Sequence, residues 1–141
     1  MTVIVSLRFR TFRWLWFDLF IFALRFNTTI ITNISINGAI FNFTIGENTQ
    51  AKEQLNQLLM EHPKEKEAWH ALAEILWSEK DFQSALEAAE KALAIDDKDL
   101  HINTTLSRIW VQIGDQKKAE HYNAQARMLG WKEQLKNPPK S

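Results

Sequence analysis

The fold is decided by the stretch from residue 66 to residue 99, which reads KEAWHALAEILWSEKDFQSALEAAEKALAIDDKD. It consists mostly of Ala, Leu, Glu and Lys, which favour helices. Apolar side chains recur at helical spacing on two stripes, which are separated by Asp81. An Asp in this place can cap the helix that follows it. The stretch therefore predicts two helices, at about 65–79 and 82–95, joined by a short turn.

Similar helical patterns lie on both sides of this stretch. Asn48 or Thr49 can cap a preceding helix, which Pro63 closes. Gly114 and Gly130 are placed to end the two helices that follow. The additional predicted helices are about 49–61, 98–113 and 116–129, with a short turn at 131–135.

A fixed shift along the chain brings this region into register with itself. Apolar or small residues then coincide in four places: Leu72 with Leu106, Ala73 with Ser107, Ala85 with Ala119, and Ala92 with Ala126. Small residues at these places let antiparallel helices approach closely. The apolar face that each helix pair leaves can be covered by the next pair, so the sequence predicts a stack of pairs.

This pattern resembles the tetratricopeptide repeat, which reads Trp-x2-Leu-Gly-x2-Tyr, Ala-x3-Phe and Pro over a period of about 34 residues. The stretch 66–99 has the Trp, the Leu and the small residues, and departs from the pattern at Leu76, Ala89 and Asp97. The resemblance covers about residues 47–135. It implies a mainly α fold, a short α-solenoid with about two repeat units plus flanking helices.

Residues 1–46 have a different composition. All Phe residues except Phe82 lie there, together with four Arg and one Asp. The change in composition divides the chain into a hydrophobic extension (1–46), a helical repeat domain (47–136) and a disordered tail (137–141).

The second half of the extension contains the dipeptide Asn37-Gly38 between alternating runs, a strong hairpin signal. With a two-residue loop, Ile36 faces Ala39 and an apolar face forms. The local pattern therefore predicts a β-hairpin over about 30–45. A tetratricopeptide array would instead place a helix at about 32–46.

Residues 1–26 allow several interpretations. Three Arg precede an apolar run at 14–24, as in a targeting segment or membrane anchor. The run is shorter than the roughly 20 residues of a spanning helix, and it contains Asp18. An interfacial membrane element, a buried strand or helix, and a disordered segment stay open alternatives. The localisation is accordingly open between cytoplasmic and membrane-associated, the latter with the repeats on the outer, periplasmic side.

Several classes of function are disfavoured. The formal net charge is +0, so there is no electrostatic signal for nucleic acid. There is no Cys, and the four His do not form a metal-binding pair on one helix. Phosphate loops and nucleophile motifs are absent from the sequence. We therefore expect a protein that is not an enzyme and has no cofactor or metal.

The resemblance implies that the first helix of each pair lines a groove that binds peptides. The residues expected to line this groove are His70, Glu74, Trp77, His101, Thr104, Arg108 and Gln112. Trp77 is equally well explained as core between helices. Positions 70, 74 and 105 do not carry the Lys, Asn and Arg with which some members of the family hold a terminal carboxylate.

The expected function is a protein-binding scaffold with a protein or peptide partner. Two alternatives stay open. One is a membrane-tethered assembly factor that associates with the membrane through residues 1–26. The other is a self-associating structural protein, a homo-oligomer that pairs through an uncovered repeat face.

Overall fold

The computed structural model describes residues 19–24, 30–33 and 35–138. The chain divides into two compact units, Met1–Ser35 and Ile36–Ser141. In the first unit, residues 19–24 and 30–33 are helical. The large apolar side chains at 19–24 are exposed: Leu19, Phe20, Ile21, Phe22 and Leu24.

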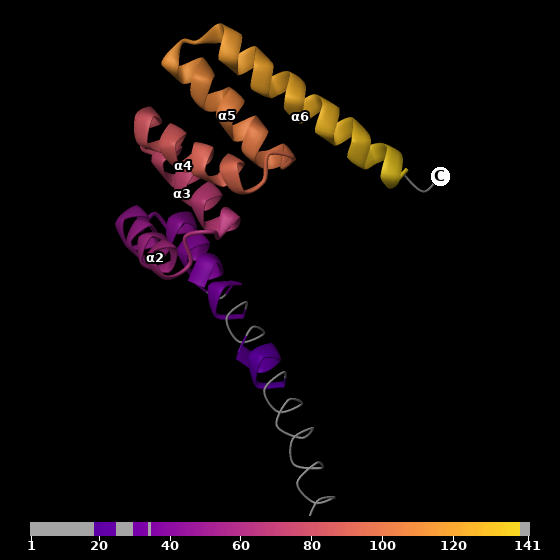
Figure 1. The fold of residues 1–141 in the computed structure, drawn as a ribbon. Coiled ribbons are helices and arrows are strands. Elements are labelled where there is room, and N and C mark those ends of the chain that lie inside the picture. Colours follow the sequence, from indigo (N-terminus) through magenta and orange to yellow (C-terminus); the bar gives the residue numbers. More distant parts are fainter. Residues whose placement is uncertain (1–18, 25–29, 34, 139–141) are drawn as a thin grey trace, which may run out of the picture. The chain divides into compact units, whose positions relative to one another are not determined.

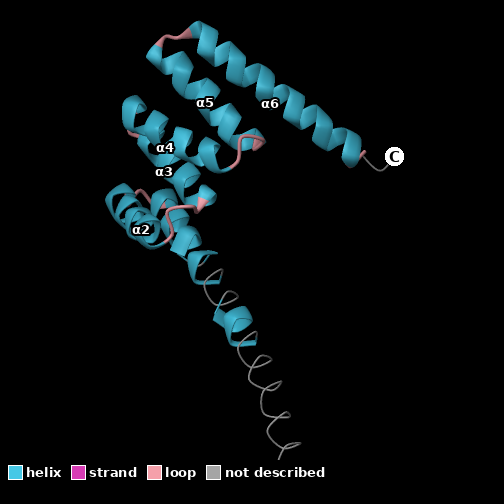
Figure 2. Ribbon diagram, viewed as in Figure 1, coloured by secondary structure: helices cyan, strands magenta, loops and turns pink. Residues whose placement is uncertain are grey.

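The described part of the second unit is built from helices, as Figures 1 and 2 show. A helical segment at 35–44 comes first; all of it except Ser35 belongs to this unit, and we call it helix 35–44. The helices after it are α2 (Asn48–Glu61), α3 (Lys66–Ser78), α4 (Phe82–Ile95), α5 (Leu100–Ile113) and α6 (Gln116–Lys136). The predicted mainly α fold of antiparallel helix pairs is confirmed.

The backbone itself shows the repeat. In the described residues, φ is positive at Gly46 (89°), Lys80 (65°) and Gly114 (92°), which follow one another at the period of the repeat. The next residue is in each case the N-cap of the following helix, and the N-caps Asp81 and Asp115 accept hydrogen bonds from backbone N–H groups. Each of these turns joins the two helices of one pair, so the unit contains three helix pairs: helix 35–44 with α2, α3 with α4, and α5 with α6.

The β-hairpin predicted around Asn37-Gly38 is wrong, because residues 35–44 are helical. Ile36 and Ala39 are buried, and Phe43 packs against the same core. Their spacing of three and four residues places them on one face of a helix. Burial of that face in the core shared with α2 outweighs the local turn signal. The helix that the tetratricopeptide resemblance places at about 32–46 is thus present at 35–44.

One hydrophobic core runs through all three pairs. Seven of its alanines have no exposed surface, and they lie on both helices of a pair: Ala39, Ala51, Ala68, Ala73, Ala85, Ala89 and Ala92. The largest fully buried side chains are Leu55, Ile75, Ile102, Leu106 and Ile109. α3 packs against α2 and α4, and α5 packs against α4 and α6, so each pair covers the one before it.

The last helix is longer than predicted. α6 continues through Gly130 to Lys136, so Gly130 does not end it. A Cβ at Gly130 would lie 3.8 Å from Leu100 Cδ1, because α6 passes close to the start of α5 there. α6 thereby includes the predicted short turn at 131–135.

The change in composition at residue 46 falls in the loop between helix 35–44 and α2, inside the second unit. The division of the chain at 46 and 136 stays a prediction. Within the described ranges, no helix has both the length and the apolar character needed to cross a membrane. Most of the predicted anchor, residues 1–18 in particular, lies outside the described residues.

Candidate functional site

A chain of polar contacts joins α3 to α5, the first helices of two successive pairs. Thr105 Oγ1 donates to Glu74 Oε1 at 2.7 Å and lies 2.9 Å from His70 Nε2. Arg108 Nη1 donates to both carboxylate oxygens of Glu74 at 3.2 Å. We call His70, Glu74, Thr105 and Arg108 the α3–α5 cluster. It exists because the repeat brings these turns of the two helices side by side.

The protonation of this cluster follows from its hydrogen bonds. Burial lowers the pKa of His70 below its ordinary value of 6.5, so the imidazole is neutral at pH 7. The single hydroxyl proton of Thr105 is donated, to Glu74 or to the His101 carbonyl. With the Thr105 proton donated to Glu74, the tautomer of His70 that satisfies the contact is the one protonated on Nε2, which donates to Thr105. The Glu74 charge is balanced by Arg108, so the cluster has no net charge.

Trp77 lies next to this cluster and has two roles. The Arg108 guanidinium lies over its ring, 4.0 Å from the centroid, a cation–π contact. The ring is half-buried and packs against the hydrophobic core. Its buried indole N–H has no hydrogen-bond partner among the described residues. Trp77 is therefore both an edge of the core and part of the surface that α3 and α5 share.

The remaining predicted groove residues lie outside the cluster. His101, Thr104 and Gln112 are exposed on α5, and the Thr104 hydroxyl donates to the Leu100 carbonyl of its own helix. The α5 residue that contacts both His70 and Glu74 is instead Thr105, which is buried. Thr105 is not among the residues predicted to line the groove, although its position was compared with the carboxylate-binding positions of other family members. Its distance of three residues from Arg108 on one helix was the available signal.

A second set of contacts lies at the other end of α3. Lys66 Nζ binds Asp99 at 2.7 Å and Asp96 at 3.0 Å. The hydrogen bond to Asp99 raises the pKa of Lys66 despite partial burial of the ammonium group. Burial raises the pKa of Asp99. The hydrogen bonds from Lys66 and from the α5 backbone lower this pKa by more than burial raises it, so the net shift is downward. Lys66 therefore ties the beginning of α3 to the cap of α5.

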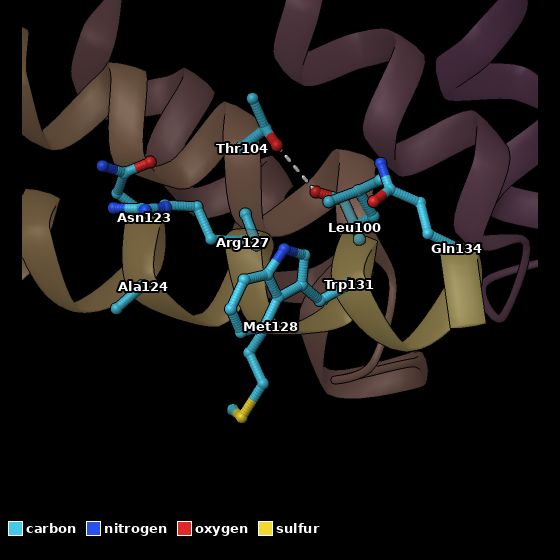
Figure 3. Close-up of a pocket in the computed structure, with 10 residues that line it drawn as sticks. Leu100, Thr104, Asn123, Ala124, Arg127, Met128, Trp131 and Gln134 are labelled. Atoms are coloured by element: carbon cyan, nitrogen blue, oxygen red, sulfur yellow. Dashed lines mark hydrogen bonds between the residues drawn. The ribbon is translucent and has the colours of Figure 1, made fainter.

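A cavity of about 760 Å³ lies between the start of α5 and the second half of α6. Figure 3 shows Leu100 and Thr104 on α5 and Asn123, Arg127 and Trp131 on α6 around this space. Trp131 and Met128 are 75% and 45% exposed. In the part of the chain that the structure describes, no group of three or more His, Asp or Glu could hold a metal ion.

Comparison with known proteins gives a family match over one stretch of the chain and a fold for the helical unit. The tetratricopeptide repeat family matches residues 66–99, which include α3, α4 and the turn between them. Comparison with curated proteins gives no match.

Among solved structures, a crystal structure of MamA aligns with a TM-score of 0.68 and 20% identity, over 72% of this chain and 60% of that one. A fragment of MamA from Desulfovibrio magneticus RS-1 aligns with a TM-score of 0.65 and 18% identity, over 70% of this chain and 55% of that one. The type III secretion translocator chaperone SycD of Yersinia enterocolitica aligns with a TM-score of 0.67 and 16% identity, over 77% of this chain and 78% of that one.

The chain thus spans about 60% of the length of the first MamA structures, and at these identities the likeness concerns the fold. The three helix pairs, the regular spacing of their turns and the family match agree with one another. Residues 66–99 are a tetratricopeptide repeat, and the helical unit that contains them has the tetratricopeptide-repeat fold.

Proposed function

We propose that the protein is a non-catalytic scaffold that binds a peptide segment of a partner protein across the first helices of its pairs. The observation that carries the proposal is the arrangement of Arg108 over Trp77 at the junction of α3 and α5. Trp and Arg are the residues most enriched at energetically important positions of interfaces. Both are held in place by the fold, which lowers the entropy lost on binding.

The charge of the site indicates the chemistry of the partner. Glu74 and Arg108 neutralise each other, and His70 is neutral at pH 7. The site therefore offers no net charge to attract a strongly acidic or basic tail. It offers hydrogen-bonding groups instead, since Glu74 takes only part of the donor set of the Arg108 guanidinium.

Apolar surface lies beside these polar groups. Phe43, Trp77 and Val111 occupy the same position of the three first helices, each one repeat after the last. Val111 is 55% exposed, and the other two are half-buried. This row supports a peptide that presents apolar side chains together with uncharged polar groups.

The test is selection of peptides from a random library displayed on phage against the full chain, followed by titration of synthetic peptides. Arg108→Ala should weaken binding of the selected peptides about tenfold or more. Lys91→Ala is the matched control, because Lys91 also lies over a tryptophan, 4.3 Å from the Trp69 centroid, but on the second helix of its pair. Equal losses in both variants, or peptides that bind through α4 or α6, would show that the groove is not the site.

A second candidate function is membrane tethering of the scaffold through the first unit. The exposed Phe20 and Phe22, 64% and 70%, support it, since apolar side chains of this kind insert into the headgroup region. Flotation of the full chain with lipid vesicles tests it. A Phe22→Asp variant should bind vesicles several-fold less tightly, and binding that is unaffected by this change, or no binding by the unchanged chain, would argue against tethering through residues 19–24.

A further inference from the structure

His70 and Glu74 lie one helical turn apart on α3, and the hydroxyl of Thr105 lies between their side chains. His70 Nε2 is 3.9 Å from Glu74 Oε1, which is too far for a hydrogen bond. Thr105 Oγ1 is 2.9 Å from that nitrogen and 2.7 Å from that oxygen. The hydroxyl therefore bridges an imidazole and a carboxylate, and the carboxylate is close enough to attract a positive charge on the ring.

The other charged groups around His70 come from the two helices that form the site. Lys66 lies on α3, and Asp99 and His101 lie at the start of α5. α2 and α4 also pack against α3, but they supply none of the groups with the largest effect on His70. Burial lowers the pKa of His70 most; Glu74 and Asp99 oppose it, whereas His101 and Lys66 add to it. The ring is 27% exposed, so it takes up a proton from solvent below pH 6.5.

This proton changes the charge of the α3–α5 cluster. In the neutral ring Nε2 carries the proton that contacts Thr105, so Nδ1 holds the free lone pair and takes the added proton. The cluster then contains two cations, His70 and Arg108, and one anion, Glu74, so its net charge rises from 0 to +1. Because Glu74 is now shared between two cations, its attraction no longer acts on Arg108 alone.

The Arg108 guanidinium is placed to use the extra charge. Among the described residues, Arg108 donates to Glu74 through Nη1 alone, at 3.2 Å from each carboxylate oxygen. A bidentate pair would use two nitrogens at about 2.7–2.9 Å. The side chain is 42% exposed and is held over the Trp77 ring. The N–H groups on Nε and Nη2 therefore remain for a ligand, and a planar fork of this kind matches a carboxylate.

We propose that protonation of His70 turns the α3–α5 cluster into a binding site for a carboxylate, so that the groove takes an acidic segment of its partner in mildly acidic solution. This proposal rests on the proposed function, because the segment lies in the same groove. Arg108 stands over Trp77, the middle member of the row formed by Phe43, Trp77 and Val111. A segment that follows the row therefore brings an Asp or Glu side chain, rather than its terminus, to Arg108.

The two protonation states favour different ligands. In neutral solution Glu74 repels an incoming carboxylate and holds Arg108, so the site favours uncharged groups. In mildly acidic solution the His70 cation neutralises Glu74, and Arg108 binds the incoming carboxylate instead. A Glu side chain in a peptide has a pKa of about 4.3 and keeps its charge at about pH 5.5. The change therefore occurs in the protein and not in the ligand.

The test repeats the library selection against the full chain at about pH 7.5 and about pH 5.5. Selection at the lower pH should enrich Asp and Glu. A synthetic peptide of this kind with blocked ends should bind at least about fivefold more tightly at the lower pH. Replacing its acidic residue with Gln should remove the difference. A Gln peptide with a free terminal carboxylate tests the other source of this group and should bind like the blocked Gln peptide.

Histidine variants identify the group that takes up the proton. His70→Gln keeps a hydrogen-bonding side chain but no titratable ring, so its affinity for the acidic peptide should be equal at the two pH values. His121→Gln, at an exposed position of α6, is the matched control and should keep the pH dependence. If the dependence were lost in His101→Gln and kept in His70→Gln, the proton would be on His101 and the proposal would be overturned.

NMR of the His70 ring in the unchanged chain gives a measurement that needs no variant. Because binding and proton uptake are linked, the acidic peptide should raise the pKa of His70, and the Gln peptide should leave it unchanged. An unchanged pKa with the acidic peptide, or no enrichment of acidic residues at the lower pH, would overturn the proposal. Selected peptides that depend on Arg108 would in that case still support the scaffold, whereas no selected peptide at either pH would overturn both proposals.

Discussion

Replacing Gly38 by Ala should stabilise the protein, and the sign of this change separates a helix from a hairpin at this position. A glycine inside a helix costs about 0.5–1 kcal/mol relative to alanine, because it loses more backbone entropy on folding. The new Cβ would lie 3.8 Å from Gln54 Oε1, an ordinary van der Waals distance, so no strain offsets the gain. We therefore expect the free energy of unfolding to rise by about 0.5–1 kcal/mol, which corresponds to a rise in Tm of about 1–4 °C.

Gly114→Ala is the matched control for this substitution. Gly114 has a φ of +92°, which L residues rarely adopt, although the space around it is open. The same added methyl group should therefore destabilise the protein there by about 1–2 kcal/mol. Urea unfolding followed by far-UV circular dichroism measures both changes. If Gly38→Ala were as destabilising as Gly114→Ala, residue 38 would have a positive φ and the helical assignment of 35–44 would be wrong.

Three further predictions concern the contacts between α3 and α5. Thr105→Val removes a buried hydroxyl that donates to a carboxylate and should lower the free energy of unfolding by about 1.5–3 kcal/mol. Thr104→Val, at an exposed position, should change it by less than about 0.5 kcal/mol; equal urea midpoints for the two variants would refute this role of Thr105. Because burial lowers the pKa of His70, His70 supports stability fully above pH 6.5 and loses this contribution as the pH falls towards its folded-state pKa. Between about pH 7.5 and pH 5 the free energy of unfolding should therefore fall more in the unchanged chain than in His70→Gln. Parallel curves of this free energy against pH for the two proteins would contradict the prediction. Lys66→Met removes the cation bound to Asp99 and should lower the free energy of unfolding by about 1 kcal/mol relative to the unchanged chain. This difference should shrink in high salt, and a salt-independent difference would point to packing instead.

The helices from α2 to α5 and the start of α6 could be predicted because the signals that define them are local. Asp81 and Asp115 cap the helices that follow them, and both are recognisable from a few neighbouring residues. The period of the repeat is likewise visible in the sequence, because each repeat must present small residues where the helices cross. The positive φ values at Gly46, Lys80 and Gly114 have the same period.

The prediction failed where a local signal competes with burial at a distance. Asn37-Gly38 favours a turn in isolation, and the alternating Ile and Phe residues around it fit strands. In the folded chain, Ile36 and Ala39 are buried in a core that includes Leu55 of α2. The free energy of that burial depends on contact with α2. It therefore cannot be inferred from the residues around the dipeptide alone.

The proximity of the candidate groove residues could be predicted at the level of helices but not of every side chain, and their role in binding a partner stays a prediction. His70, Glu74, Trp77 and Arg108 lie together as expected, because the period places α3 and α5 in equivalent positions. Choosing between Thr104 and Thr105 requires the rotation of α5 about its own axis, since adjacent residues of a helix point about 100° apart. That rotation is set by packing against α4 and α6.

The sequence by itself determined the helix-forming segments and the period of the repeat, and it predicted that α3 and α5 lie in equivalent positions. These properties follow from propensity, capping and spacing, which act over a few residues or one turn. The tertiary structure decided that residues 35–44 complete a third pair and that Thr105 links Glu74 to His70. Each of these depends on which surfaces meet, and the free energy of such contacts arises when distant segments exclude water together.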